Sequence, residues 1–136
     1  MARYSGTPLV KKLGIKADDR VLLVNPPVGF ESEIVAMAPG TTFVSESRVP
    51  LDVILLFVRS AKDLEAQFKR IAKKLTQSGG FWVAWPKKSS GLATDLSFDA
   101  VQRVGLAVGL VDNKICAINE TWSGLRFVTR VKDRTS

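Results

Sequence analysis

The stretch that decides the fold is LDVILLFV, residues 51–58, near the middle of the chain. Its six residues from Val53 to Val58 are all apolar and do not alternate with polar ones. A run of this kind is typical of a parallel strand that helices cover on both faces. It is also far shorter than the roughly 20 apolar residues that a membrane-spanning helix needs. We therefore expect a buried central strand here.

Short helical and strand patterns alternate on both sides of this stretch. Before it, the apolar run Val21–Val24 predicts a second buried strand. After it, Ser60 is a suitable cap for a helix whose apolar stripe includes Leu75 and which we expect to end at Gly79-Gly80. The remaining predicted elements are a helix over 8–13 capped by Thr7, a helix over 30–37, strands over 41–44 and 81–85, a helix over 97–108 capped by Ser97, and strands over 114–119 and 125–131.

The order of these elements predicts an α/β fold. Helices that alternate with buried strands, joined by right-handed crossovers, form a three-layer, mostly parallel sheet. The last two strands are joined by the short segment 120–124, and we expect them to form a C-terminal antiparallel hairpin. A chain of 136 residues suffices for one domain of this kind and is too short for two, so we expect a single domain over residues 1–136.

Composition excludes several kinds of chemistry. The chain has no histidine, which excludes histidine acid–base catalysis, Ser-His-Asp triads and zinc sites built on imidazole. A single cysteine, Cys116, excludes an internal disulfide and Cys-x-x-Cys metal sites, so no metal site is expected. The formal net charge is +7, from 20 Lys and Arg against 13 Asp and Glu.

The sequence shows no targeting pattern. Residues 1–14 hold no apolar stretch of the length of a signal peptide, and no run is long enough to span a membrane. A lone cysteine agrees with a reducing compartment. We expect a soluble, cytoplasmic protein with no membrane partner.

Three segments resemble the class I S-adenosylmethionine-dependent methyltransferases. Residues 13–24 are similar to the entry into the first strand of that family, 52–57 to its fourth strand and 78–83 to its fifth. The closing hairpin resembles the family's antiparallel sixth and seventh strands. The resemblance implies a Rossmann-like, methyltransferase-like fold of reduced size, with S-adenosylmethionine as the cofactor to consider.

Other segments resemble a small bacterial family, domain-of-unknown-function family 3052. They are residues 4–9, 83–91 and 120–125, which include the sequences VAWPKKSSG and ETWSGL. This resemblance implies the same fold in a bacterial protein, and it brings no established activity.

The sequence departs from the methyltransferase pattern directly after the first strand. That family carries a glycine-rich loop there, because the backbone must approach the cofactor closely. Here the loop reads Asn25-Pro26-Pro27-Val28-Gly29. Two prolines remove two backbone N–H donors and one glycine remains. The usual cradle for S-adenosylmethionine is therefore incomplete, and the cofactor stays undetermined.

The best candidate site is the loop Trp85–Gly91, just past the carboxyl end of a central strand, where open α/β sheets bind ligands. Two lysines and two serines there can hold an anion such as phosphate or carboxylate, and Trp85 can form an apolar wall. A solvated basic loop is the alternative interpretation.

Glu46, 21 residues after Asn25, is placed to contact a hydroxyl group of a ligand, unless it is an ordinary exposed carboxylate. The predicted ligand-binding residues are Asn25, Glu46, Arg59, Trp85, Lys87, Lys88 and Ser89.

Three functions remain open, and the sequence does not decide whether the chain is an enzyme. The first is a non-catalytic module that binds a small anionic ligand or a protein partner, and the second is an S-adenosylmethionine-dependent methyltransferase. The third is non-specific nucleic-acid binding through a basic surface, although no helix-turn-helix, zinc finger or paired aromatic motif accompanies the cations. The cations form three groups: Lys11, Lys12 and Lys16; Lys69, Arg70, Lys73 and Lys74; and Arg126, Arg130, Lys132 and Arg134.

Overall fold

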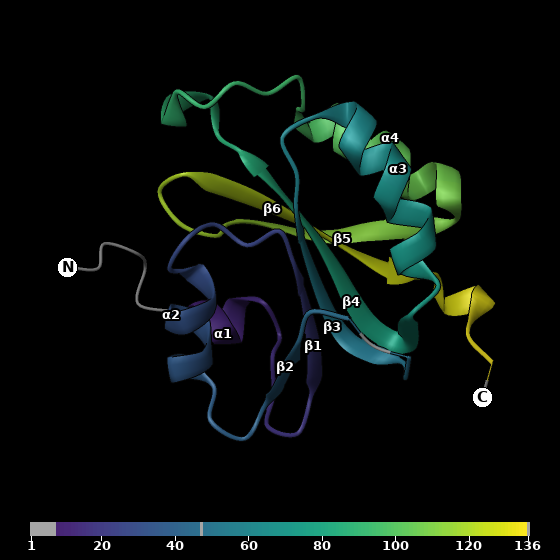
Figure 1. Cartoon of the computed structure of the whole chain (residues 1–136). Coiled ribbons are helices and arrows are strands. Elements are labelled where there is room, and N and C mark those ends of the chain that lie inside the picture. Colours follow the sequence, from purple (N-terminus) through teal and green to yellow (C-terminus); the bar gives the residue numbers. More distant parts are fainter. Residues whose placement is uncertain (1–7, 47, 136) are drawn as a thin grey trace.

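A computed structural model describes residues 8–46 and 48–135 of the chain, and Figure 1 shows its arrangement. The strands are β1 (Arg20–Val24), β2 (Thr42–Val44), β3 (Leu51–Phe57), β4 (Leu75–Pro86), β5 (Leu110–Ala117) and β6 (Trp122–Thr129). They form one sheet in the order β2-β1-β3-β4-β6-β5. The first four strands pair in parallel, whereas β6 pairs antiparallel with both β4 and β5.

Helices cover both faces of the sheet. Their bounds are α1 (Leu9–Lys12), α2 (Phe30–Met37), α3 (Ala61–Ala72) and α4 (Phe98–Val108), with two short 3₁₀ turns, η1 (Lys88–Ser90) and η2 (Val131–Asp133). Figure 1 shows α1 and α2 on one face and α3 and α4 on the other. The predicted three-layer α/β class, with a mostly parallel sheet and a C-terminal antiparallel hairpin, is confirmed. Within the described residues, no helix has the length and apolar character of a membrane span.

The predicted central strand, β3, is buried at every position except Asp52. Successive side chains enter two different cores. Ile54 and Leu56 pack on the side of α3 and α4, whereas Leu55 and Phe57 pack on the side of α1 and α2. Because both faces are covered, every position favours an apolar residue, which explains the absence of alternation.

Two helices begin at their predicted caps. Ser60 Oγ accepts the N–H of Asp63 at 3.1 Å, and Ser97 Oγ accepts the N–H of Ala100 at 3.2 Å. These bonds satisfy amide groups that the first turn of a helix leaves without helical partners. The predicted cap Thr7 lies outside the described residues.

The predicted end of α3 at Gly79-Gly80 is wrong. The helix ends at Ala72, and Leu75, expected on its apolar stripe, is the first residue of β4. Both glycines lie inside β4, where a Cβ on Gly80 would collide with the guanidinium group of Arg126. The glycine pair therefore marks a close approach to a neighbouring strand rather than the end of a helix.

The last two strands are longer than predicted, and the turn between them is shorter. β5 begins at Leu110 and β6 at Trp122, so residues 122–124 belong to a strand and not to the turn. Asn119 tightens the turn, because its Oδ1 accepts the N–H groups of Thr121 and Trp122, both at 2.9 Å. A short side-chain-stabilised turn of this kind is difficult to locate from the sequence pattern.

Candidate functional site

The carboxyl ends of the central parallel strands lie at one edge of the sheet, here named the carboxyl edge. Asn25 directly follows β1, Lys87 directly follows β4, and Arg59 comes two residues after β3. The N–H of Val58 donates to the carbonyl oxygen of Ala84 at 2.9 Å, which sets the ends of β3 and β4 side by side. The structure thus brings Asn25, Arg59 and Lys87 to the same edge, and their binding role stays a prediction.

The long loop after β4 is fixed to the start of α3 by three hydrogen bonds. Thr94 Oγ1 donates to the carbonyl oxygen of Arg59 at 2.6 Å, and Arg59 Nε donates to the carbonyl oxygen of Ala93 at 3.4 Å. Asp95 Oδ1 accepts the N–H of Ala61 at 2.8 Å. The first turn of α3 therefore has partners within the chain, which leaves it little capacity to bind an external anion.

The tip of this loop, η1 and the residues beside it, carries the predicted anion-binding groups. Ser90 is engaged locally, because its Oγ donates to the carbonyl oxygen of Lys87 at 2.7 Å and accepts a backbone N–H two residues later at 3.1 Å. Lys88 and Ser89 are exposed, and Lys87 is half-buried. The tip thus presents two ammonium groups and one hydroxyl group at the carboxyl edge.

Trp85 lies beneath the loop rather than beside a cavity in it. Its ring is 6% exposed and packs on the α3–α4 side in the same core as Val58 and Leu96. It supports the loop from below and offers almost no surface to a ligand, so the structure gives no support to its expected role as a wall. Trp82 faces the opposite core, where its Nε1 donates to the carbonyl oxygen of Leu13 at 3.0 Å.

The turn after β1 has few backbone donors. Asn25 adopts the left-handed conformation with φ 55°, and two prolines without N–H groups follow it. Gly29, with φ 85°, caps α2, and a Cβ added there would meet nothing within 4 Å. The glycine is therefore required by its backbone conformation and not by a close neighbour. The first turn of α2 carries Glu31 and Glu33, whose charges oppose an anion at this helix end.

An aromatic row fills the space under the carboxyl edge on the α1–α2 side. Phe30 contacts Phe57 edge-to-face with ring centroids 5.0 Å apart, and Phe57 contacts Trp122 in the same way at 5.1 Å. All three side chains are buried. The row joins α2, β3 and β6, so this part of the edge is a packed core.

Glu46 lies apart from the loop tip. β2 has only three residues, and its last residue, Val44, pairs with Leu22 rather than with the last residue of β1. The exposed Glu46 lines a cavity of about 260 Å³ on the α3 side of β1 and β2. The charged residues that line this cavity with it are Arg70 and Lys74. The structure therefore does not bring Glu46 together with the predicted loop residues.

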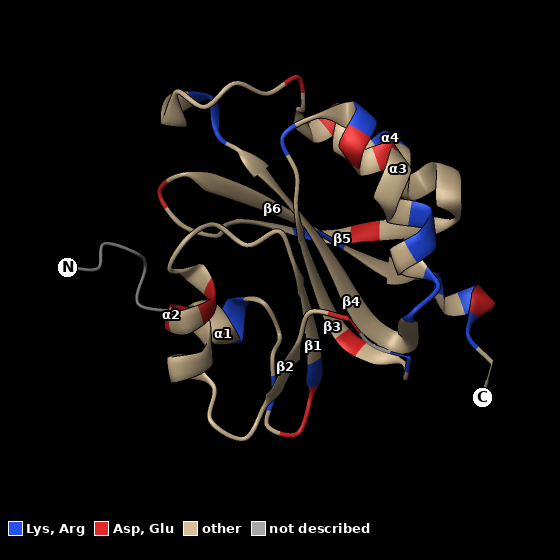
Figure 2. Ribbon diagram, in the orientation of Figure 1, with Lys and Arg blue, Asp and Glu red and all other residues tan. Residues whose placement is uncertain are grey.

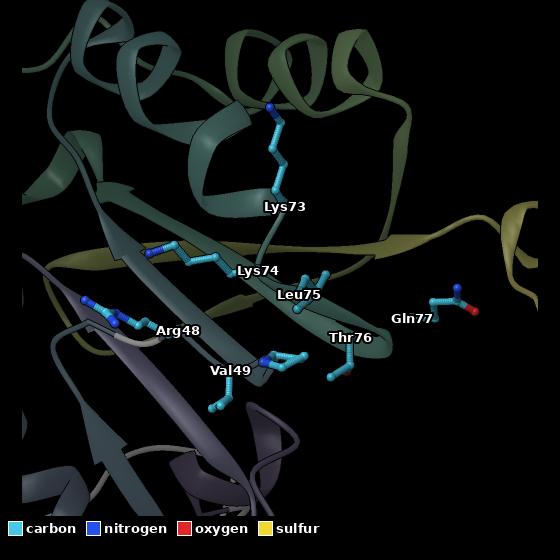
Figure 3. A pocket seen from close by; sticks show the side chains of 8 residues that line it. Arg48, Val49, Lys73, Lys74, Leu75, Thr76 and Gln77 are labelled. Carbon is cyan, nitrogen blue, oxygen red and sulfur yellow. The ribbon is translucent and has the colours of Figure 1, made fainter.

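A second cavity, of about 460 Å³, lies at the amino ends of β3 and β4 and carries three cations (Figure 3). Arg48 comes from the segment before β3, whereas Lys73 and Lys74 follow the end of α3. The sequence shows these lysines only as part of a polar helix face, and no local pattern pairs them with Arg48, 25 residues before Lys73. The lining residues are Arg48, Val49, Pro50, Lys73, Lys74, Leu75, Thr76 and Gln77.

Among the residues that the structure describes, Arg126 and Cys116 have shifted pKa values. Burial, and then repulsion by Arg134, lower the pKa of Arg126, whose Nη1 donates to Asn113 Oδ1 at 3.3 Å. Burial raises the pKa of the Cys116 thiol, which disfavours the reactive thiolate. In the part of the chain that the structure describes, no group of three or more His, Cys, Asp or Glu is arranged to hold a metal ion.

Solved methyltransferase structures have similar folds. An S-adenosylmethionine-dependent methyltransferase from Aquifex aeolicus matches with a TM-score of 0.66 at 12% identity, over 88% of this chain and 86% of that one. Magnesium protoporphyrin IX methyltransferase from Synechocystis, with bound S-adenosylmethionine, matches with a TM-score of 0.58 at 9% identity, over 90% of this chain and 74% of that one. Aeropyrum pernix fibrillarin, with natively bound S-adenosylmethionine, matches with a TM-score of 0.57 at 11% identity, over 88% of this chain and 73% of that one.

Other similar structures belong to longer proteins, of which this chain spans about half or less. No family model and no curated protein matches the chain, so the resemblance to family 3052 stays a prediction. Identities this low establish the fold and not the activity. The chain has the Rossmann-like fold of the class I methyltransferases, built here on six strands.

Proposed function

We propose that the chain is a methyltransferase-like domain that binds a small anionic ligand or a protein partner and does not catalyse methyl transfer. The turn after β1 carries this proposal. Its two prolines, Pro26 and Pro27, remove two backbone N–H donors at the position where the cofactor would be held. S-adenosylmethionine has a carboxylate and a nucleoside that need donors and a close backbone approach. The residues present at this turn do not fit that cofactor.

The competing proposal is an S-adenosylmethionine-dependent methyltransferase. It rests on the fold, since three of the similar structures hold S-adenosylmethionine. A shared fold does not transfer an activity, which depends on the residues at the site. Binding of S-adenosylhomocysteine decides between the two proposals.

The proposed anion site is the loop tip at the carboxyl edge. Lys87, Lys88 and Ser89 offer charge and a hydroxyl group there, and Arg59 is held at the base of the loop by its bonds to Ala93 and Thr94. Charged donors on a loop at this edge suit phosphate or carboxylate. Asn25 is exposed at the same edge, whereas Glu46 and Trp85 fall outside the proposed site.

Lys87→Ala/Lys88→Ala is expected to weaken the binding of inorganic pyrophosphate about tenfold or more, because each lost charge-assisted hydrogen bond is worth about 1.5 kcal/mol or more. Isothermal titration of the full chain at low salt measures the effect. The matched variant Lys11→Ala/Lys16→Ala removes two exposed lysines on the α1 side and should bind as the unchanged chain does. Unchanged affinity in the first variant would exclude the loop tip as the anion site.

A further inference from the structure

We give the name α3 groove to the hollowed surface beside the end of α3. It consists of the two cavities already described, which share Lys74 as a lining residue. The segment that joins β2 to β3 lies between Val44 and Leu51. The helices of this face pack mainly over β4, β5 and β6, which leaves the groove open along β1 and β2 (Figure 1).

Cations line both walls of the groove. Arg70 lies in the last turn of α3, Lys73 and Lys74 follow this helix, and Arg48 comes from the segment before β3. In Figure 3 the side chains of Arg48 and Lys74 extend in the same direction across the strands. Glu46 is the one carboxylate among the lining residues of the two cavities. Four cations against one anion produce a positive potential that a groove concentrates.

The positive charge continues beyond the groove along the C-terminal segment. Gln77, which lines the larger cavity, exchanges two hydrogen bonds with Thr135: its Nε2 donates to Thr135 Oγ1 and its Oε1 accepts the Thr135 N–H, both at 2.8 Å. These bonds hold the segment that carries Lys132, Asp133 and Arg134 close to the start of β4. Figure 2 shows basic residues of α3, of the turn after it and of this segment at one end of the molecule.

We propose that the α3 groove binds the phosphate backbone of a nucleic acid. A small anion would contact only one or two of these cations, whereas a chain of phosphates can contact cations spread along a groove and past its end. The concave walls admit a chain, but a flat anionic bilayer would not reach the half-buried Lys74. The floor residues Leu22, Val24 and Leu75 are apolar, so we expect little discrimination between bases. This site is separate from the loop tip and does not depend on the function proposed above.

Arg48→Ala/Lys73→Ala/Lys74→Ala tests the proposal in the full chain. The probe is a fluorescein-labelled oligodeoxythymidylate of about 20 nucleotides, and its anisotropy gives Kd at several salt concentrations. The slope of log K against log salt is negative, and each lost phosphate contact reduces its magnitude by about 0.7 for a single strand. In the triple variant the magnitude of the slope should therefore fall by about 2. Its affinity for the oligonucleotide should fall about tenfold or more near 100 mM salt.

Two controls separate the groove from net charge and from folding. Lys11→Ala/Lys16→Ala/Arg103→Ala removes the same charge from exposed positions outside the groove and should leave the slope unchanged. Lys73→Arg/Lys74→Arg keeps the charge and should bind as the unchanged chain does. A thermal melt checks the fold, which the alanines should preserve because Lys74 accepts the N–H of Leu51 through its backbone carbonyl, at 2.8 Å.

Several results would overturn the proposal. Equal losses of oligonucleotide affinity in the groove triple variant and in the control triple variant would show that net charge alone drives binding. An unchanged chain without affinity for the oligonucleotide at about 50 mM salt would remove the nucleic-acid partner. Binding of inorganic phosphate alone would leave a small-anion site, and sedimentation with phosphatidylserine vesicles without oligonucleotide binding would assign the groove to a membrane surface.

Discussion

Replacing Phe68 with alanine is expected to lower the free energy of unfolding by about 4 kcal/mol, a large part of the 5 to 15 kcal/mol typical of a domain. The ring is 1% exposed in the core between α3 and the sheet. It stacks on Phe81 with centroids 4.5 Å apart and meets Phe127 edge-on at 5.4 Å. Alanine leaves a cavity bordered by two strands and ends both aromatic contacts.

Urea denaturation followed by tryptophan fluorescence measures this loss. Phe98→Ala is the matched control, because Phe98 is 36% exposed at the start of α4. This variant should lower the free energy of unfolding by less than about 1 kcal/mol. A loss for Phe68→Ala as small as that of the control would show that the aromatic cluster does not anchor α3 on the sheet.

Gly105→Ala is expected to destabilise the chain, although alanine is the better helix former by about 1 kcal/mol. Gly105 is buried in α4, where a Cβ would collide with the ring of Phe127. That ring is itself 0% exposed, so it cannot move aside without displacing its neighbours. We expect a net loss of about 2 to 3 kcal/mol in urea denaturation.

Two further variants isolate the cause of that loss. Ala107→Gly changes an exposed position of the same helix and should lose about 1 kcal/mol through helix propensity alone. Gly105→Ala combined with Phe127→Leu gives the Cβ more room and should lose less than the sum of the two single changes. A rise in stability for Gly105→Ala would contradict the close packing of α4 on β6.

Most elements could be predicted because their signals are local. The non-alternating run of β3 and the capping serines Ser60 and Ser97 each act within a few residues. The prediction failed at Gly79-Gly80, where Gly80 is required by a contact with Arg126, 46 residues further along, and Gly79 by the carbonyl oxygen of Asp52. A glycine required by a distant side chain and a glycine that ends a helix look the same in one sequence.

The site could be predicted only in part, for a similar reason. Residues that directly follow parallel strands gather at the carboxyl edge, and applying this rule requires only the order of the strands. It therefore placed Asn25, Arg59 and Lys87 together. The spacing from Asn25 to Glu46 did not reveal that Glu46 follows the edge strand β2, which β1 and β3 separate from β4 and the loop tip. The α3 groove depends on two segments that meet through the sheet, so its cations resembled an ordinary solvated helix face in the sequence.

Isothermal titration of the full chain with S-adenosylhomocysteine tests most directly whether the fold has been kept without its usual cofactor. We expect no saturable heat with ligand up to about 1 mM, because the two prolines in the turn after β1 remove backbone donors that this ligand needs. A thermal melt of the same sample confirms that the chain is folded. A saturable isotherm with one site per chain and a micromolar Kd would contradict the proposal and identify the chain as a candidate methyltransferase.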